Sequence, residues 1–142
     1  MASPTYTSLV ELTANFFHLH WNNHLLGDCP TWLTWDNFLF GSVPNHAHAG
    51  CYAVLFGENL GYVGLGASRG GGIYVEHGIS RRLTRNVIQP DRARGRDWSK
   101  LRDRYADATA ICTIGLPSAN YLAASLETYL IRSLFPPMNS RV

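Results

Sequence analysis

Apolar residues recur with helical spacing near the start of the chain. The repeat consists of Leu9, Leu12, Phe16, Leu19 and Leu26. Its intervals of three, four, three and seven residues place these side chains on one face of a helix. Ser8 and Glu11 form a capping-box pattern at the beginning of the repeat, and Gly27 follows its last member. The pattern therefore predicts a helix over residues 8–26.

Strand-like runs dominate the middle of the chain. Residues 50–56 favour a strand, residues 57–60 have the length of a hairpin turn, and residues 61–65 return as a second strand. A third strand is predicted over residues 108–114, because this apolar run is closed by a glycine and a proline. Three antiparallel strands would make a small central sheet.

Loops and helices account for the remaining segments. The aromatic-rich segment 32–40 is predicted to be a short helix or turn, and the segments 42–50 and 66–78 are predicted to contain loops. Helices are predicted over 81–88, from Trp98 within the polar segment 91–105, and over 118–134. The element order predicts an α+β fold in which helices flank a three-stranded antiparallel sheet. Residues 1–49 would form a helical N-terminal extension.

Composition limits the class of protein. The chain has 142 residues, of which 46% are hydrophobic and 15% charged, so one domain with a buried core is expected. The apolar runs are shorter than the roughly 18 residues that span a bilayer, so no membrane association is expected. The three cysteines are widely spaced without a Cys-x-x-Cys pattern, which together with the absence of a signal-like N-terminus favours a cytoplasmic protein.

Positive charge is concentrated in one segment. Residues 81–104 contain nine Lys or Arg and three Asp, whereas residues 1–80 contain one Arg and five acidic residues. Eight of the nine cations are arginine, whose planar guanidinium can bind a phosphate through two hydrogen bonds. The segment is either a phosphate-binding face, with nucleic acid as a candidate partner, or a solvated surface of Asp–Arg pairs.

Glu127 lies among apolar residues of the last predicted helix. Ala123 precedes it by one turn, and Leu130 and Ile131 follow it on the same apolar surface. Burying an unpaired carboxylate costs several kcal/mol, so Glu127 must pair with a cation, become protonated or bind a metal ion. The small side chain of Ala123 would leave open space beside the carboxylate, which favours a functional site.

The order of these motifs resembles the GIY-YIG nuclease family. Residues 50–52 (Gly-Cys-Tyr) and residues 62–64 (Tyr-Val-Gly) stand where the family has its Gly-Ile-Tyr and Tyr-Ile-Gly tripeptides on two hairpin strands. Arg82, Glu127 and Asn139 are similar to the family's helical arginine, later helical glutamate and asparagine after a proline-containing turn. Each tripeptide alone is a weak signal, but five elements in the family's order make a stronger one.

Two features depart from the family pattern. The interval from Tyr62 to Arg82 is longer than in compact members, so the glycine-rich segment reads as an insertion. Four residues after Arg82 many members carry a histidine or tyrosine, whereas this chain has Asn86, for which His77 or Tyr74 could substitute.

The resemblance implies a GIY-YIG-like domain that cuts DNA with the help of a divalent metal ion. Glu127 would ligate one Mg²⁺ or Mn²⁺ ion, and Arg82 would hold the scissile phosphate. Tyr52 would be the general base, provided that nearby cations favour its phenolate. Tyr62 would order the water network, and Asn139 would orient substrate or a second water. The expected activity is that of an endodeoxyribonuclease, a phosphodiester hydrolase.

The nuclease domain would span residues 50–142, with DNA as its partner. The residues expected to bind nucleic acid are His77, Arg81, Arg85, Arg92, Arg94, Arg96 and Lys100. Cleavage of both strands by a chain with one site is compatible with a homodimer. Two other readings stay open: a non-catalytic nucleic-acid-binding module on the same scaffold, and a zinc hydrolase that uses N-terminal histidines such as His20 and His24.

Overall fold

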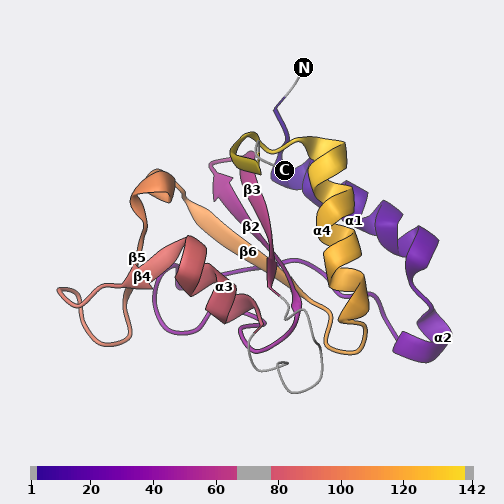
Figure 1. Ribbon diagram of the computed structural model, residues 1–142, viewed down its shortest axis with the longest axis horizontal. Helices are drawn as coiled ribbons and strands as arrows, with labels where there is room; N and C mark the ends of the chain where they lie inside the picture. The colour runs from indigo at the N-terminus through magenta and orange to yellow at the C-terminus, as the bar shows by residue number, and fades with distance from the viewer. Residues whose placement is uncertain (1–2, 67–77, 140–142) are drawn as a thin grey trace.

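The computed structural model describes residues 3–66 and 78–139, in which helices and two antiparallel sheets form an α+β fold (Figure 1). The α-helices are α1 (Tyr6–His20), α2 (Asn23–Leu26), α3 (Ile79–Asn86) and α4 (Tyr121–Leu134). Two short 3-10 helices are η2 (Asp103–Tyr105) and η3 (Pro137–Asn139). The predicted α+β class is therefore confirmed. No helix in this part of the chain is long and apolar enough to cross a membrane.

The central sheet has four strands, so the predicted number of three is wrong. Strand β2 (Gly50–Phe56) lies between β3 (Asn59–Gly66) and β6 (Ala110–Gly115). The fourth strand, β1 (Leu33–Thr34), pairs with the outer side of β6, and the backbone N–H of Trp35 continues the pairing by donating to Ile111 at 2.9 Å. A two-residue strand is too short to show alternation in the sequence, which is why the aromatic-rich segment read as a turn.

The hairpin of β2 and β3 follows the prediction with a tighter turn. Gly57 and Glu58 connect the strands, and Gly57 has φ = +66°, a conformation that glycine adopts without steric cost. The second strand therefore begins at Asn59, before the predicted position. The register places Tyr52 opposite Gly64 on β3 and opposite Thr113 on β6.

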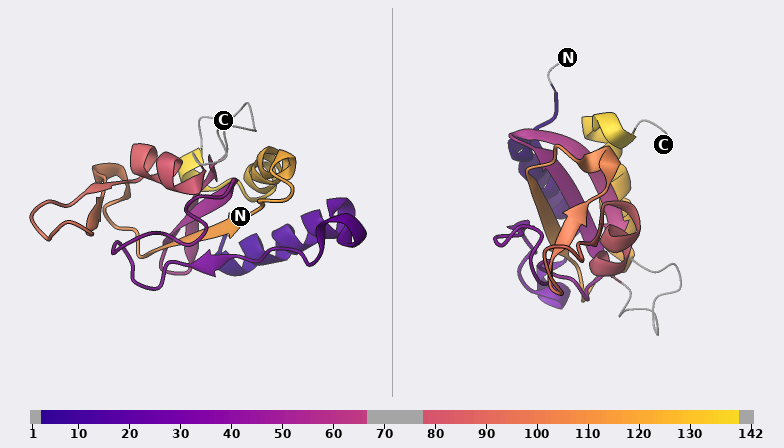
Figure 2. Two further views of the ribbon diagram at one scale, coloured as in Figure 1. Left: turned by 90° about the horizontal axis from the view of Figure 1, so that it is seen from below. Right: turned by 90° about the vertical axis from the view of Figure 1, so that its left-hand side faces the viewer.

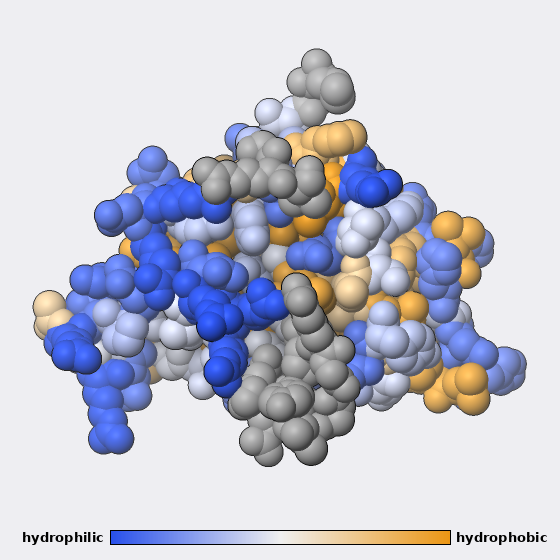
Figure 3. Space-filling view, in the orientation of Figure 1, coloured by the Kyte–Doolittle hydropathy of each residue, from blue (hydrophilic) through white to orange (hydrophobic). Residues whose placement is uncertain are grey.

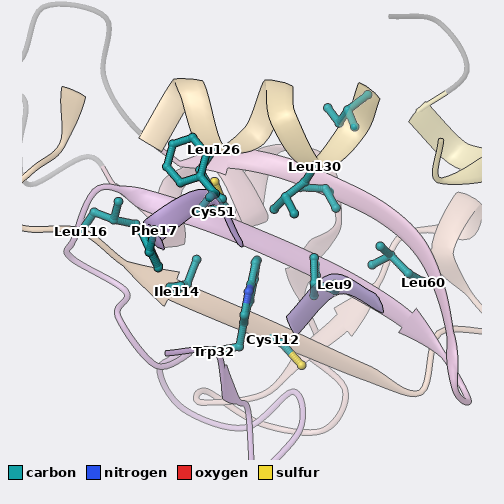
Figure 4. Packing of buried hydrophobic residues seen from close by; sticks show 14 of the residues in the cluster. Leu9, Phe17, Trp32, Cys51, Leu60, Cys112, Ile114, Leu116, Leu126 and Leu130 are labelled. Carbon is teal, nitrogen blue, oxygen red and sulfur yellow. The ribbon is translucent and has the colours of Figure 1, made fainter. Parts of the chain in front are cut away.

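Helices α1 and α4 cover one face of the sheet, and α3 packs on the other. Figure 4 shows the first core, in which Leu126 and Leu130 of α4 and Leu9 of α1 pack on the face of the sheet that carries Cys51 of β2. The second core joins α3 to the opposite side of β2, and also buries Tyr105 of η2. In Figure 1, α1 and α4 lie on one side of the central sheet, and α3 and then the β4–β5 hairpin lie on the other. The N-terminal segment thus shares its core with the predicted nuclease domain.

The first helix begins and ends earlier than predicted. Thr5 caps α1, because its Oγ1 accepts a hydrogen bond from the Ser8 N–H and its own N–H donates to Ser8 Oγ at 2.8 Å. The capping box is therefore Thr5–Ser8, one turn before the predicted one. The chain leaves the helix at Trp21. Asn22 then caps the separate helix α2, because its Oδ1 accepts hydrogen bonds from the backbone N–H groups of His24 and Leu25.

The predicted helix from Trp98 is wrong, since this region forms a hairpin. Strands β4 (Ile88–Pro90) and β5 (Ser99–Leu101) pair with each other. The backbone of residues 39–41 braces the hairpin: Ser99 N–H donates to the Leu39 carbonyl at 2.8 Å, and Gly41 N–H donates to the Asp97 carbonyl at 2.9 Å. Pairing with a segment so distant in sequence leaves no periodic signal in the hairpin itself.

The two later helices are confirmed with shifted ends. Helix α3 starts at Ile79 after Gly78, without a side-chain cap, and α4 starts at Tyr121. Ser80, which precedes the predicted helix 81–88, is inside α3. Most of the predicted loop in the glycine-rich segment, residues 67–77, lies outside the described residues.

Candidate active site at the edge of strand β3

Strand β3 is an edge strand whose outer backbone groups are covered by segments from both halves of the chain. At its start, Leu60 N–H donates to the Pro4 carbonyl at 2.8 Å. Further along, the side chain of Asn139 binds the backbone of Val63, and the carboxylate of Glu127 interacts with the backbone N–H of Leu65. Covering an edge strand satisfies backbone groups that would otherwise pair with water or another chain. Two predicted site residues, Asn139 and Glu127, therefore lie along this edge of the sheet.

Asn139 is held by two hydrogen bonds to one residue. Its Oδ1 accepts from Val63 N–H at 2.9 Å, and its Nδ2 donates to the Val63 carbonyl at 2.9 Å. The side chain is 8% exposed. This geometry makes Asn139 a positioning residue that anchors η3 on β3, rather than a group that is free to turn toward a substrate.

Replacing Asn139 with alanine should lower the free energy of unfolding by about 2–4 kcal/mol. The substitution removes both hydrogen bonds and leaves two buried backbone groups of Val63 without their partner. Urea unfolding followed by circular dichroism measures the change. Asn120→Ala is the matched control, because Asn120 precedes α4 without making a side-chain capping bond. Equal midpoints for the two variants would contradict the anchoring role.

Glu127 is half-buried where α4 crosses the end of β3. Burial raises the pKa of its carboxyl group, while the Arg82 guanidinium and the Leu65 N–H offset part of that rise. The carboxylate also lies close enough to Cys51 to help burial raise the pKa of the thiol. Since Cys51 and Leu65 are opposite each other in the register, Glu127 sits above this pair. The sequence-based expectation of a carboxylate at the core margin agrees with this position.

Arg82 approaches Glu127 from the other side of the edge strand. Helix α3 packs directly on the end of β3, since a Cβ on Gly66 would lie 2.5 Å from Ile79 Cα. The missing side chain lets the first turn of α3 come this close. Arg82 is half-buried, whereas Arg81 and Arg85 on the same helix are exposed. Arg82 is thus the arginine of α3 that acts on the carboxylate.

Tyr52 lies deeper than its expected role requires. Its side chain is 1% exposed, and its ring lies against Gly64, where a Cβ would be 2.6 Å from Tyr52 Cε1. Burial and the nearby Tyr62 phenol raise the pKa of Tyr52, so its surroundings favour the neutral phenol rather than the phenolate. The hydroxyl accepts a hydrogen bond from Asn86 Nδ2 at 3.4 Å.

Asn86 is therefore a site residue in its own right. It occupies the position four residues after Arg82, one turn further along α3, and it contacts Tyr52. In the sequence this position lacks the family's histidine or tyrosine, for which His77 or Tyr74 was expected to substitute. Both of those residues lie outside the described part of the chain. The spacing from Arg82 was the signal that identifies Asn86.

Tyr62 is the more accessible of the two tyrosines. It stands on the edge strand itself and is half-buried, with its ring centroid 6.0 Å from that of Tyr52 and 5.8 Å from that of Tyr105. The Arg104 guanidinium lies 5.9 Å from the Tyr62 ring centroid, and one of its Nη atoms donates to the Met138 carbonyl at 2.6 Å. Arg104 was missed in the sequence because it was one of nine similar cations.

The phenols and the carboxylate occupy opposite faces of the sheet. Tyr52 and the hydrophobic side of α3 belong to the second core, whereas Cys51, next to Glu127, belongs to the first. They converge only around the edge of β3, which α3 and α4 flank. A phosphate at this edge would meet Arg82 and Glu127 first, and Tyr62 would be the nearer phenol.

Six of the seven residues expected to bind nucleic acid belong to α3 or to the β4–β5 hairpin. Hydrophilic residues gather over α3 and the β4–β5 hairpin, as Figure 3 shows. The exposed cations there are Arg81, Arg85, Arg92, Arg94, Arg96 and Lys100. The seventh predicted residue, His77, is outside the described residues.

The donor set near Glu127 fits only a metal ion that takes few protein ligands. Across residues 3–66 and 78–139, no group of three or more His, Cys, Asp or Glu side chains could hold a metal ion. Mg²⁺ commonly binds through one or two carboxylates and keeps water and substrate phosphate oxygens as its other ligands. A single half-buried carboxylate with an arginine within electrostatic reach is compatible with that mode.

Comparisons of the chain with protein-family models, with curated proteins and with solved structures gave no match.

Proposed function

We propose that the chain is a divalent-metal-dependent DNA endonuclease of the GIY-YIG type, whose site lies at the edge of β3. The proposal is supported by one observation above all. Arg82 on α3 is near enough to Glu127 on α4 to lower the pKa of its carboxyl group, although the two helices pack on opposite faces of the sheet at the end of the strand that carries Tyr62. A cationic group that can bind an anion and a hard oxygen ligand within electrostatic reach of each other suit phosphodiester hydrolysis.

The position of each residue indicates its role. Arg82 binds a non-bridging oxygen of the scissile phosphate and so orients it for in-line attack. Glu127 would hold Mg²⁺ or Mn²⁺, and the bound ion would supply positive charge for the leaving oxygen. Tyr62 orients the attacking water through its hydroxyl. The neutral Tyr52 packs against the Tyr62 ring and holds it in place.

This assignment differs from the sequence-based expectation in one respect. Tyr52 was expected to be the general base, but a buried phenol whose pKa is raised is a weak base at neutral pH. We therefore assign the contact with water to Tyr62. Asn139 keeps η3 on β3 and stays out of the reaction.

Incubation of supercoiled plasmid with the protein tests the activity. Nicking in Mg²⁺ that stops in EDTA would support the endonuclease. A homodimer is part of the proposal. A chain with one site can cut both DNA strands only if two copies act together or if one copy binds the DNA twice in succession. Sedimentation of the protein with and without DNA measures this.

Tyr62→Phe should lower kcat roughly 100-fold, within the range for a lost water-positioning or proton-transferring group. Tyr52→Phe should lower kcat by about tenfold or less, because the buried phenol acts only through Tyr62 and Asn86. Steady-state cleavage of a labelled oligonucleotide separates kcat from KM. The opposite order of effects would return the general-base role to Tyr52.

A non-catalytic nucleic-acid-binding module is the second candidate. It is favoured by the single carboxylate near the site, since the described residues hold no fuller set of metal ligands. The exposed arginines on α3 and on the β4–β5 hairpin would be sufficient for such a protein. Tight DNA binding without cleavage in Mg²⁺ or Mn²⁺, unchanged in Glu127→Gln, would identify it.

A further inference from the structure

The β4–β5 hairpin ends in a loop that extends away from the body of the molecule. We call residues 91–98 the arginine loop, because its exposed cations are Arg92, Arg94 and Arg96. Figures 1 and 2 show this loop as the most distant point of the fold on the side of α3. A projecting loop that carries alternating arginines is available to a partner much larger than a metabolite.

Backbone hydrogen bonds fix the shape of the arginine loop. The Asp91 carbonyl accepts from Arg94 N–H and from Gly95 N–H, each at 3.2 Å, and Asp91 Oδ1 also accepts from Arg94 N–H at 3.3 Å. Asp91 N–H donates to the Trp98 carbonyl at 3.0 Å, closing the base of the loop. Gly95 has φ = +139°, which a residue with a side chain rarely adopts. The loop is thus organised before any partner binds.

A stack of side chains positions one arginine of the loop. The Arg94 guanidinium lies 3.6 Å from the centroid of the Trp98 ring, and the Phe40 ring lies 4.9 Å from that of Trp98. Phe40 belongs to the backbone segment that braces the hairpin. Stacking leaves the guanidinium edges available for hydrogen bonds while reducing the side-chain entropy lost on binding.

The size and charge of the arginine loop suit the major groove of B-form DNA. That groove is about 12 Å wide and admits a two-stranded β-ribbon, and its guanine edges accept bidentate hydrogen bonds from arginine. The major groove of A-form RNA is too narrow for side chains to read. Single strands have no groove at all. Arg81 and Arg85 of α3 lie on the same hydrophilic side and can contact the adjoining phosphates.

We propose that the arginine loop enters the major groove of B-form duplex DNA, with the stacked Arg94 as its central contact, and so restricts the substrate to duplex DNA. The inference rests on the proposed function for the identity of the substrate. It names the form of nucleic acid that the site receives, which the β3 edge alone does not determine.

Binding measured without cleavage tests the loop separately from the nuclease. Fluorescence anisotropy in EDTA compares one 20-base-pair sequence as duplex DNA, as duplex RNA and as single-stranded DNA. The variants are Arg94→Ala, Arg92→Ala with Arg96→Ala, and Trp98→Leu. Arg132→Ala, which removes an exposed arginine at the far end of α4, is the matched control. Circular dichroism confirms that each variant is folded.

Wild type should bind duplex DNA at least tenfold more tightly than the other two probes. Arg94→Ala should weaken binding to duplex DNA by about five- to tenfold, in the range of one lost base contact, and should remove most of the preference. The double variant should reduce the slope of log affinity against log salt by about two. Equal losses on all three probes, or unchanged affinity for duplex DNA, would overturn the inference. Plasmid nicking by wild type in Mg²⁺ reports on the nuclease regardless of these results.

Discussion

Glu127→Gln should reduce Mg²⁺-dependent cleavage by roughly two to three orders of magnitude, the size expected when a preorganised electrostatic group is removed from a reaction site. The amide keeps the shape of the side chain but has no negative charge with which to hold a divalent cation. Initial rates of plasmid nicking over a series of Mg²⁺ concentrations measure the effect. Glu11→Gln, in the exposed part of α1, is the control and should cleave at the wild-type rate.

The same variant should be more stable than wild type at neutral pH. Burial raises the pKa of the Glu127 carboxyl, so the folded protein binds this proton more tightly than the unfolded chain. The stabilising contribution is present below the unfolded pKa, near pH 4, and is lost as the pH rises through the folded value. Glutamine removes this loss, so its advantage should grow between about pH 4 and pH 7.

Urea unfolding of wild type and Glu127→Gln at several pH values checks the sign. A variant that is less stable than wild type at pH 7 would mean that the electrostatic attraction to Arg82 outweighs the burial of the carboxylate. In that case Glu127 would be a structural residue, and the site at the β3 edge would lose its metal ligand. Normal cleavage by the variant would lead to the same conclusion.

Gly64→Ala should destabilise the protein by about 1–3 kcal/mol or more, since it places a methyl group inside the volume of the Tyr52 ring. Tyr52 cannot move aside easily, because its ring is buried between the sheet and α3. Displacing it should also disturb Tyr62 and slow cleavage. Denaturant midpoints and nicking rates follow the two effects.

A double-mutant cycle identifies the cause. Tyr52→Leu makes room for the new methyl group, so the double variant should lose less stability than the two single variants together, with a coupling of about 0.5–3 kcal/mol. Gly61→Ala is the control on the same strand, because its Cβ would meet the half-buried ring of Phe56, which can turn toward solvent. Strict additivity would show that Tyr52 and Gly64 do not compete for the same space.

Local sequence signals predicted the elements that are stabilised by neighbours in sequence. The β2–β3 hairpin, the apolar face of α1 and the final helix each carry a period or a turn that is visible in a short window. Strand β1 and the β4–β5 hairpin carry none. Strand β1 takes its backbone partners from β6, and the β4–β5 hairpin, whose strands pair with each other, is braced by residues 39–41; both β6 and residues 39–41 are remote in sequence. Such pairing is a property of the folded chain, so a local pattern cannot reveal it.

The candidate site divides in the same way. The apolar neighbours of Glu127 already placed a carboxylate at the margin of the core, and the structure puts it there. The burial of Tyr52 and the engagement of Asn139 with Val63 depend on how two elements dock, and no spacing in the sequence encodes that. The family resemblance predicted the candidate residues. The packing of the folded chain determines which of their side chains are accessible to a substrate.

The shared core of α1 and α4 limits how this chain can be used in protein engineering. Leu9 and Phe16 of α1 are buried with Leu126 and Leu130 of α4. A chimaera that transplants residues 50–142 alone onto a programmable DNA-targeting protein would expose the apolar side of α4 to solvent and so promote aggregation. Any portable version must therefore include the first helix, and fusion partners are better attached at a surface loop than in place of the N-terminal segment.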